Sequence, residues 1–192
     1  LEEIEGIIQA NRDNLVIVDE AYVDFGAQSA IPLVKRYDNL LVVQTFSKSR
    51  ALAGARLGFA VAQDEIIKDL NQMRCSTNPY NLDRMSLAVG VAALEDAAYY
   101  EACCRTIMEN REWAAGELRR LGFGVLESKA NFLFASHPAI SGADLYAGLR
   151  QEGILARHFA LPRIADYIRI TIGDAGQMQA LTAALARILG EG

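Results

Sequence analysis

Cysteine and histidine are scarce in this chain of 192 residues. The three cysteines are Cys75, Cys103 and Cys104, and the two histidines are His137 and His158. An odd number of cysteines with an adjacent pair does not suit a disulfide framework and indicates a reducing compartment. Neither residue type shows the spacing of a zinc site, so we expect no bound metal. We interpret all three cysteines as structural thiols.

An excess of positive charge and a long apolar run are also missing. The chain carries 19 Lys and Arg against 24 Asp and Glu, which gives a net charge of −5. This balance argues against a broad surface for polyanions, so nucleic acid is not an expected partner. No run of 18 or more apolar residues occurs and no signal peptide is visible, so we expect no membrane association and a cytoplasmic location.

Apolar residues, in contrast, are plentiful. They make up 52% of the chain, which is ample for one large domain or two small ones. The chain begins at Leu1, within a helical pattern, and not at a methionine. We therefore expect it to be a fragment of a longer protein.

Two apolar runs, residues 15–18 and residues 40–43, are typical of buried parallel strands. Each is followed by polar residues: Asp19-Glu20-Ala21-Tyr22 after the first run, and Thr45-Phe46-Ser47-Lys48 after the second. Arg56 comes later, across a stretch of small residues that lets the backbone fold back tightly. Open α/β sheets bind ligands at the carboxyl ends of their parallel strands, so we expect these polar side chains to meet in one site.

The side chains after the second run suit a phosphorylated aldehyde. The Lys48 amine can form a Schiff base with an aldehyde. The hydroxyls of Thr45 and Ser47 and the guanidinium of Arg56 together make a phosphate site. We therefore predict a cofactor site in which Lys48 is the catalytic residue.

The side chains after the first run suit a pyridine ring. A buried Asp19 carboxylate opposite the ring nitrogen would keep that nitrogen protonated, so that the ring draws electrons from a carbanion. Tyr22 would hydrogen-bond the phenolic oxygen of the ring, and Ala21 would lie against the ring face, where a larger side chain would not fit. The full set predicts pyridoxal 5'-phosphate as the cofactor, bound by Asp19, Ala21, Tyr22, Thr45, Ser47, Lys48 and Arg56.

Each motif also has another interpretation. An aspartate at a strand end is often a helix N-cap, and a Ser-Lys pair on a loop is usually solvated surface. Val18-Asp19-Glu20-Ala21 also resembles the acidic strand end of nucleotide-driven ATPases, where two carboxylates handle magnesium and water. That function needs a Gly-x-x-x-x-Gly-Lys-Ser/Thr loop, which the sequence does not contain. The occurrence of all the parts in order favours pyridoxal phosphate.

Together these motifs resemble those of the fold-type I aminotransferases, and within them the histidinol-phosphate aminotransferase subgroup. The resemblance covers nearly all 192 residues. After the lysine the family commonly has a small residue and an aromatic one, whereas this chain has Ser49-Arg50, which adds a charge near the site. Beyond the two strand-end motifs, the residues that carry the resemblance are Leu52-Ala53-Gly54-Ala55-Arg56-Leu57-Gly58, Asn78-Pro79-Tyr80-Asn81-Leu82, Ala130-Asn131-Phe132-Leu133, Gly153-Ile154-Leu155-Ala156-Arg157-His158-Phe159 and Tyr167-Ile168-Arg169-Ile170-Thr171-Ile172-Gly173.

The resemblance implies an α/β fold class: part of the large domain of the fold-type I transferases, with three layers and a mainly parallel sheet, plus a small C-terminal α/β domain. The implied boundaries are 1–95 for the large-domain part, 96–121 for a linking helix and 122–192 for the small domain. An N-terminal portion that completes the phosphate site would be missing. The implied enzyme is a homodimer that moves an amino group between L-histidinol phosphate, as amino donor, and 2-oxoglutarate, as acceptor.

Periodicity and turn residues predict the individual elements. The predicted helices are 1–11, 64–73, 83–94, 96–121, 142–152 and 175–189, and the predicted strands are 15–19, 40–44, 57–62, 124–126, 131–134, 154–156 and 167–172. The strand at 57–62 is apolar on both faces, as in a covered sheet, and a loop is expected at 75–82. Asp64 is the expected N-cap of the second helix, and Ser141 or Ser136 that of the fifth.

Substrate-binding residues are expected in the C-terminal part. Alternation along the strand at 167–172 places Arg169 and Thr171 on the face opposite three isoleucines. Arg169 is then either solvated or a bidentate clamp for a substrate α-carboxylate, and the resemblance favours the clamp. The resemblance also implies that Arg157 binds substrate through its phosphate and that Asn131 helps to orient the carboxylate.

Three alternatives stay open at this point. The same superfamily includes aromatic-amino-acid aminotransferases and a threonine-phosphate decarboxylase, which the sequence separates weakly from the first choice. The chain could also be an ATPase module that uses Asp19-Glu20 as a metal site. Finally, an isolated fragment could be a folded but inactive half-protein whose only capacity is association.

Overall fold

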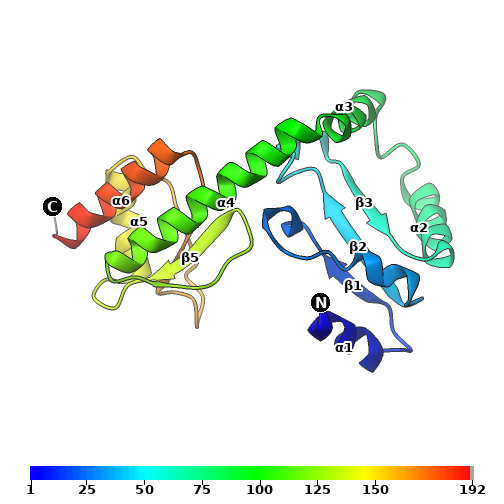
Figure 1. Ribbon diagram of the computed structural model, residues 1–192, viewed down its shortest axis with the longest axis horizontal. Helices are drawn as coiled ribbons and strands as arrows, with labels where there is room; N and C mark the ends of the chain where they lie inside the picture. The colour runs from blue at the N-terminus through cyan, green and yellow to red at the C-terminus, as the bar shows by residue number, and fades with distance from the viewer. Residues whose placement is uncertain (191–192) are drawn as a thin grey trace. The chain divides into compact units, whose positions relative to one another are not determined.

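The computed structural model describes residues 1–190 and divides into two compact units (Figure 1). Unit 1 spans Leu1–Ala102, and unit 2 begins at Cys103. In chain order, unit 1 contains α1 (Glu2–Ala10), β1 (Val16–Asp19), η1 (Val23–Phe25), η2 (Ile31–Lys35), β2 (Leu40–Thr45), η3 (Ala53–Ala55), β3 (Gly58–Val61), α2 (Asp64–Thr77) and α3 (Arg84–Glu95).

A long helix, α4 (Ala97–Arg120), begins in unit 1 and continues in unit 2. The range predicted for a linking helix, 96–121, is thus helical. The assignment of residues 1–95 to a large domain and of residues 122–192 to a small one stays a prediction. Neither α4 nor any other helix within residues 1–190 combines the length and apolar character needed to cross a membrane.

The sheet of unit 1 has the strand order β1-β2-β3. β1 and β2 are parallel, with Asp19 opposite Val43, and β3 is antiparallel to β2, with Gly58 opposite Thr45. The β-branched residues of β1 and β2 favour extended, pleated backbone. Because both parallel strands end at the edge where β3 begins, the residues that follow them are brought to one edge of the sheet.

One face of this sheet is covered by α1 and η2, and the other is open along β1. The covered side forms a buried cluster that consists of Ile8, Ala30, Leu33, Val34, Tyr37, Leu40 and Val42. On the open side Ile17 is 59% exposed, whereas Leu41, its partner on β2, is only 4% exposed. Phe59 of β3 pairs with Gln44 and lies on the same face as Val61, yet it is 41% exposed. The prediction that the strand at 57–62 is covered on both faces is wrong for residues 1–190, because no residue of β3 is buried.

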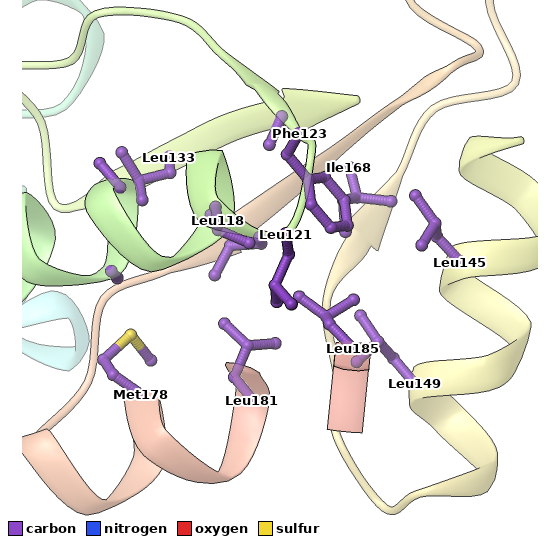
Figure 2. Packing of buried hydrophobic residues seen from close by; sticks show 14 of the residues in the cluster. Leu118, Leu121, Phe123, Leu133, Leu145, Leu149, Ile168, Met178, Leu181 and Leu185 are labelled. Carbon is purple, nitrogen blue, oxygen red and sulfur yellow. The ribbon is translucent and has the colours of Figure 1, made fainter. Parts of the chain in front are cut away.

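Unit 2 closes its own core. It contains β4 (Gly124–Val125), β5 (Phe132–Ser136), α5 (Gly142–Gln151), β6 (Arg157–His158), β7 (Tyr167–Thr171) and α6 (Ala175–Leu189). The strands form an antiparallel sheet of order β4-β5-β7-β6. Figure 2 shows leucines of α4, α5 and α6, among them Leu118, Leu145 and Leu185, packing into one cluster with Leu133 of β5 and Ile168 of β7.

The predicted elements are confirmed to within two residues at each end, except in two places. α2 ends at Thr77 and not at residue 73, so the predicted loop at 75–82 begins later. The hydroxyls of Ser76 and Thr77 donate to carbonyl oxygens of the preceding turn, which lets these polar residues stay helical. The strand predicted at 154–156 lies instead at Arg157–His158, where pairing with β7 begins.

Helix caps were predicted less well than helices. Ser141 caps α5 by accepting a hydrogen bond from the backbone N–H of Asp144, which confirms one of the two candidates. Asp64 is not a cap, because Gln63 holds the cap position of α2 and Asp64 lies in the first turn, where its charge suits the helix dipole. Asp174 starts a capping box on α6 that the sequence analysis did not identify.

Candidate active site

The ends of β1 and β2 and the start of β3 surround a cavity of about 460 Å³. Six of the seven residues predicted to bind the cofactor are in its wall. The seventh, Tyr22, lies close by: the Nζ atom of Lys48 is 5.4 Å from the centre of the Tyr22 ring. The wall consists of Asp19, Ala21, Val43, Gln44, Thr45, Ser47, Lys48, Ala53, Arg56 and Gly58.

Asp19 ends β1 with its carboxylate in the cavity wall. Its Oδ1 atom accepts a hydrogen bond of 3.0 Å from the backbone N–H of Ala21, which turns the chain at the strand end. The side chain is exposed and not buried as predicted, because it lies on the same open face as Ile17. Asp19 does not cap a helix: the next element, η1, has Tyr22 at its cap position and no capping side chain.

The buried carboxylate at this strand end belongs to Glu20, which is only 7% exposed. Its oxygens accept hydrogen bonds from the Ser29 hydroxyl (2.7 Å), the Ala30 N–H (2.5 Å) and Gln44 Nε2 (2.8 Å). These donors stabilise a charge that burial would otherwise disfavour. Glu20 thereby ties the end of β1 to the end of β2. Glu20 was not among the residues predicted for the cofactor site.

The turn after β2 presents Lys48. The Thr45 hydroxyl donates to the carbonyl oxygen of Leu57 (3.3 Å) and accepts from the Ser47 N–H (3.1 Å). The Ala51 N–H donates to the carbonyl oxygen of Lys48 (3.1 Å) and closes a second turn. The Thr45 hydroxyl thus shapes the turn, whereas the Ser47 hydroxyl forms no hydrogen bond within residues 1–190. The Lys48 side chain is exposed in the cavity wall.

Arg56 reaches the same cavity because the chain folds back on itself. The Phe46 N–H donates to the carbonyl oxygen of Leu57, and the Leu52 N–H donates to that of Phe46. Arg56 has φ of 55°, and Ala51 has φ of 54°. Non-glycine residues are uncommon in this left-handed region and persist where surrounding contacts hold them, often at functional sites. The predicted return through small residues is therefore observed.

The two arginines predicted to bind substrate are neighbours in unit 2. Arg157 of β6 lies directly opposite Arg169 of β7. Both guanidinium groups lie near the ring of Phe159, at 5.4 Å and 5.8 Å from its centre, and Arg169 also lies 5.4 Å from that of Phe132. Within residues 1–190 neither forms a salt bridge. Asn131 precedes β5, and its backbone carbonyl accepts a hydrogen bond from Ile172.

The cavity in unit 1 holds an amine, a guanidinium, a carboxylate and two hydroxyls. An amine can attack an aldehyde carbon, and a guanidinium with a hydroxyl can bind a phosphate. A carboxylate can accept a hydrogen bond from a protonated ring nitrogen. The small side chains of Ala21 and Ala53 leave room for a flat ring. The residues therefore fit a ring compound that carries both an aldehyde and a phosphate. Within residues 1–190 no three His, Cys, Asp or Glu side chains gather as a metal site would require.

Comparison with known sequences places the chain among aminotransferases. The family model described as aminotransferase class I and II matches residues 1–188. Histidinol-phosphate aminotransferase 2 of Dechloromonas aromatica is 52% identical over 190 residues, and histidinol-phosphate aminotransferase of Pseudomonas putida is 53% identical over 186 residues. The alignments cover 99% and 97% of this chain and 53% of each relative, so the chain spans about half the length of the curated relatives it matches.

Solved structures show the same fold. The histidinol-phosphate aminotransferase of Clostridium acetobutylicum matches with a TM-score of 0.90 and 24% identity, over 100% of this chain and 59% of its own. That of Sinorhizobium meliloti, in complex with pyridoxal-5'-phosphate, matches with a TM-score of 0.85 and 25% identity, over 98% of this chain and 52% of its own. The predicted fold class, part of the α/β fold-type I transferases, is confirmed. Since the family model matches nearly the whole sequence, the chain belongs to the aminotransferase class I and II family.

Proposed function

We propose that this chain is part of a pyridoxal-phosphate-dependent aminotransferase that moves an amino group between L-histidinol phosphate and 2-oxoglutarate, with imidazole-acetol phosphate and glutamate as the other pair. This reaction belongs to histidine biosynthesis. The carrying observation is the single cavity in whose wall Asp19, Ser47, Lys48 and Arg56 meet. The names of relatives about half identical to this chain support the choice of substrates.

The cavity residues divide the cofactor among themselves. Ser47 and Arg56 bind the phosphate, and Thr45 holds the turn that presents Ser47. Asp19 accepts a hydrogen bond from the protonated ring nitrogen, which is the role of a carboxylate in pyridoxal enzymes. Two more residues complete the set: Tyr22 donates to the phenolic oxygen, and Ala21 lies against the ring face.

Lys48 both attaches the cofactor and moves protons. Bound pyridoxal phosphate would supply an aldehyde carbon for the substrate nitrogen and a ring that withdraws electrons. With the substrate amine in its place, the free Lys48 amine would take the proton from the substrate α-carbon and return it to the former aldehyde carbon, as a general base and then a general acid. Its exposed position in the cavity wall and its short turn suit a group that must move between these atoms.

Arg169 and Arg157 bind the acidic groups of the two substrates. Arg169 binds the carboxylate of glutamate, which Asn131 helps to orient, and Arg157 binds the phosphate of histidinol phosphate. Two guanidinium groups on directly opposite residues of paired strands provide two anion sites side by side. Arg157→Ala should lower kcat/KM for histidinol phosphate by roughly tenfold to a hundredfold and change that for glutamate less. Full retention of the rate with histidinol phosphate would remove Arg157 from this role.

A reduction trap tests the cofactor assignment. The full-length protein is incubated with pyridoxal phosphate, reduced with borohydride, and digested for peptide mass mapping. A single adduct on Lys48 is the expected result, and the Lys68→Ala variant should give the same adduct because Lys68 is an exposed residue of α2 outside the cavity. Absence of an adduct, or labelling scattered over surface lysines, would overturn the proposal. The same trap on residues 1–192 alone asks whether this half-site is already organised.

A substrate panel separates the related activities. Histidinol phosphate should be the best amino donor among histidinol phosphate, aromatic amino acids and threonine phosphate. Faster reaction with an aromatic amino acid, or release of carbon dioxide from threonine phosphate, would assign the chain to one of the alternatives. The ATPase alternative is not retained, because the family assignment and the missing phosphate loop both oppose it.

We further propose a homodimer in the cytoplasm. The dimer rests on the resemblance to aminotransferases with sites near a subunit interface. The location is supported by three free cysteines, of which Cys75 is exposed, since a reducing compartment keeps such thiols free. Sedimentation of the full-length protein should give twice the monomer mass.

A further inference from the structure

We propose that Arg50 is a positioning residue. It holds the turn that presents Lys48 through contacts with α3 and α4, outside the cavity wall. The inference rests on the proposed function of Lys48. Arg50 is two residues from Lys48, yet it is not among the residues that line the cavity. The Arg50 guanidinium therefore makes its contacts outside the cavity wall.

The guanidinium of Arg50 contacts the junction between α3 and α4. Its Nη1 atom donates a hydrogen bond of 2.6 Å to the carbonyl oxygen of Ala93. Its Cζ atom lies 3.9 Å from the centre of the Tyr100 ring and 5.7 Å from that of Phe46. Cations at such distances over aromatic rings are attracted by the ring electrons. Arg50 thus joins the turn after β2 to two helices that lie more than 40 residues further along the chain.

The bond to Ala93 uses a group that a helix leaves without a partner. Ala93 is in the last turn of α3, where carbonyl oxygens have no N–H to accept from within the helix. A cation at this end also interacts favourably with the helix dipole. An arginine is suited to this place because its planar group can donate in its plane and stack on Tyr100 with its face. A lysine could do only one of the two at a time.

The same turn is held by a second contact, made by Ser49. The Ser49 hydroxyl donates to the carboxylate of Asp24 in η1. Ala51, directly after Arg50, has the unfavourable positive φ, and such a conformation persists where surrounding contacts over-determine it. Ser49 and Arg50 therefore anchor the turn to two different parts of unit 1, and Lys48 immediately precedes both. Where the family commonly has a small residue and an aromatic one after the lysine, this chain has two residues that form hydrogen bonds.

The test compares three variants of the full-length protein. Arg50→Met removes the donor and the charge while keeping a long side chain, and Arg50→Lys keeps only the charge. Arg84→Met is the matched control, because Arg84 is exposed in unit 1 and forms no salt bridge within residues 1–190. Two quantities are measured: the rate at which Lys48 forms its reduced pyridoxal adduct, and the hydrogen exchange of the backbone amides of residues 47–52.

We expect Arg50→Met to slow adduct formation by roughly tenfold to a hundredfold, since small misplacements of a reacting group have effects of that size. Exchange at residues 47–52 should be faster, Arg50→Lys should be intermediate in both readouts, and Arg84→Met should match the unaltered protein. Arg50→Met with unchanged adduct rate and unchanged exchange would overturn the inference. If Arg50→Met does not fold, Tyr100→Leu decides, because it removes the ring and leaves the Ala93 bond; unchanged values there would overturn it equally.

The two proposals fail in different ways. If the unaltered protein forms no Lys48 adduct, the proposed function is wrong, whereas the exchange measurement still shows whether Arg50 holds the turn. If the unaltered protein forms the adduct and Arg50→Met forms it equally fast, only the inference about Arg50 is wrong.

Discussion

The two units differ in how completely they bury their apolar side chains. Unit 2 has one buried cluster of sixteen residues, whereas the cluster around the sheet of unit 1 has seven. Among the described residues, fourteen exposed large hydrophobic side chains lie in unit 1 and four in unit 2, at Trp113, Leu126, Leu155 and Leu161. Folding of residues 1–102 thus leaves more of its large apolar side chains exposed.

The difference follows from the sheets. In unit 2, α4, α5 and α6 cover the antiparallel sheet with their apolar faces. In unit 1, α1 and η2 supply such cover on one face, and on the other face Ile17 of β1 stays exposed. Unit 1 nevertheless carries the proposed catalytic lysine. The position of this lysine is set by hydrogen-bonded turns and by the buried Glu20, which joins the ends of β1 and β2. It depends less on a closed core.

The largest effect on activity is expected from Lys48→Ala. The variant should lower the transamination rate by at least about 10²- to 10⁴-fold, the usual contribution of a positioned proton-transfer group. Its thermal stability should stay unchanged, because the Lys48 side chain is exposed. Steady-state kinetics and a melting curve measure both, with Lys68→Ala as the control. A stability loss equal to that of a core variant would show that the site of unit 1 is structurally essential.

The next effect tests the unequal burial directly. Leu145→Ala removes a fully buried side chain of α5 and should lower the free energy of unfolding by about 2–5 kcal/mol. Ile17→Ala, on the open face of β1, should change it by less than about 0.5 kcal/mol. Urea unfolding, monitored by amide hydrogen exchange in each unit, measures the effects of the two variants separately. Equal losses would show that protein outside residues 1–190 covers the open face.

What the sequence predicted well depended on strong local patterns. The apolar runs before Asp19 and Thr45 identified β1 and β2, and parallel pairing then brought their polar ends to one edge. The buried role of Glu20 was also present in the pattern, because alternation along β1 puts it on the face opposite Asp19. Its donors could not be predicted in the same way, because Ser29, Ala30 and Gln44 come from separate segments that only the fold brings to Glu20.

Other features could not be predicted because they depend on distant chain. The direction of Arg50 is set by a carbonyl at the end of α3, and its environment by a ring in α4. The exposure of Asp19 depends on whether anything covers the open face of the sheet. β6 has only two residues, which is too short for periodicity to locate it, so its position followed from pairing with β7.

A smaller effect is expected at the start of α6 in unit 2. The Asp174 carboxylate accepts from the Gln177 N–H (2.8 Å), and the Gln177 side chain accepts from the Asp174 N–H (3.0 Å). Asp174→Ala removes one half of this capping box and should lower stability by about 0.5–2 kcal/mol. The loss should appear in unit 2 amides, with unit 1 unaffected. Equal changes in both units would contradict their description as separate cores.

The smallest effect concerns the matching cap in unit 1, at the start of α3. The backbone N–H and the hydroxyl of Ser86 both donate to Asp83 at 2.8 Å, and these bonds lower the pKa of the Asp83 carboxyl below its ordinary value of 3.8. Since the folded-state pKa is the lower one, the cap stabilises α3 above the unfolded-state pKa. That contribution is lost as the pH falls through the lowered pKa.

Comparison of acid titrations should reveal this cap. Asp83→Ala should weaken protection of the first turn of α3 at neutral pH, and the gap to the unaltered protein should shrink below about pH 4. Asp83→Asn, which caps without a charge, should instead give a pH-independent result. Amide exchange of Ser86 and Leu87 provides the measurement. Because the carboxylate is exposed, solvent limits the effect, and we expect a smaller gap than that caused by Asp174→Ala. A gap as large would mean that α3 depends on its cap as much as α6 does.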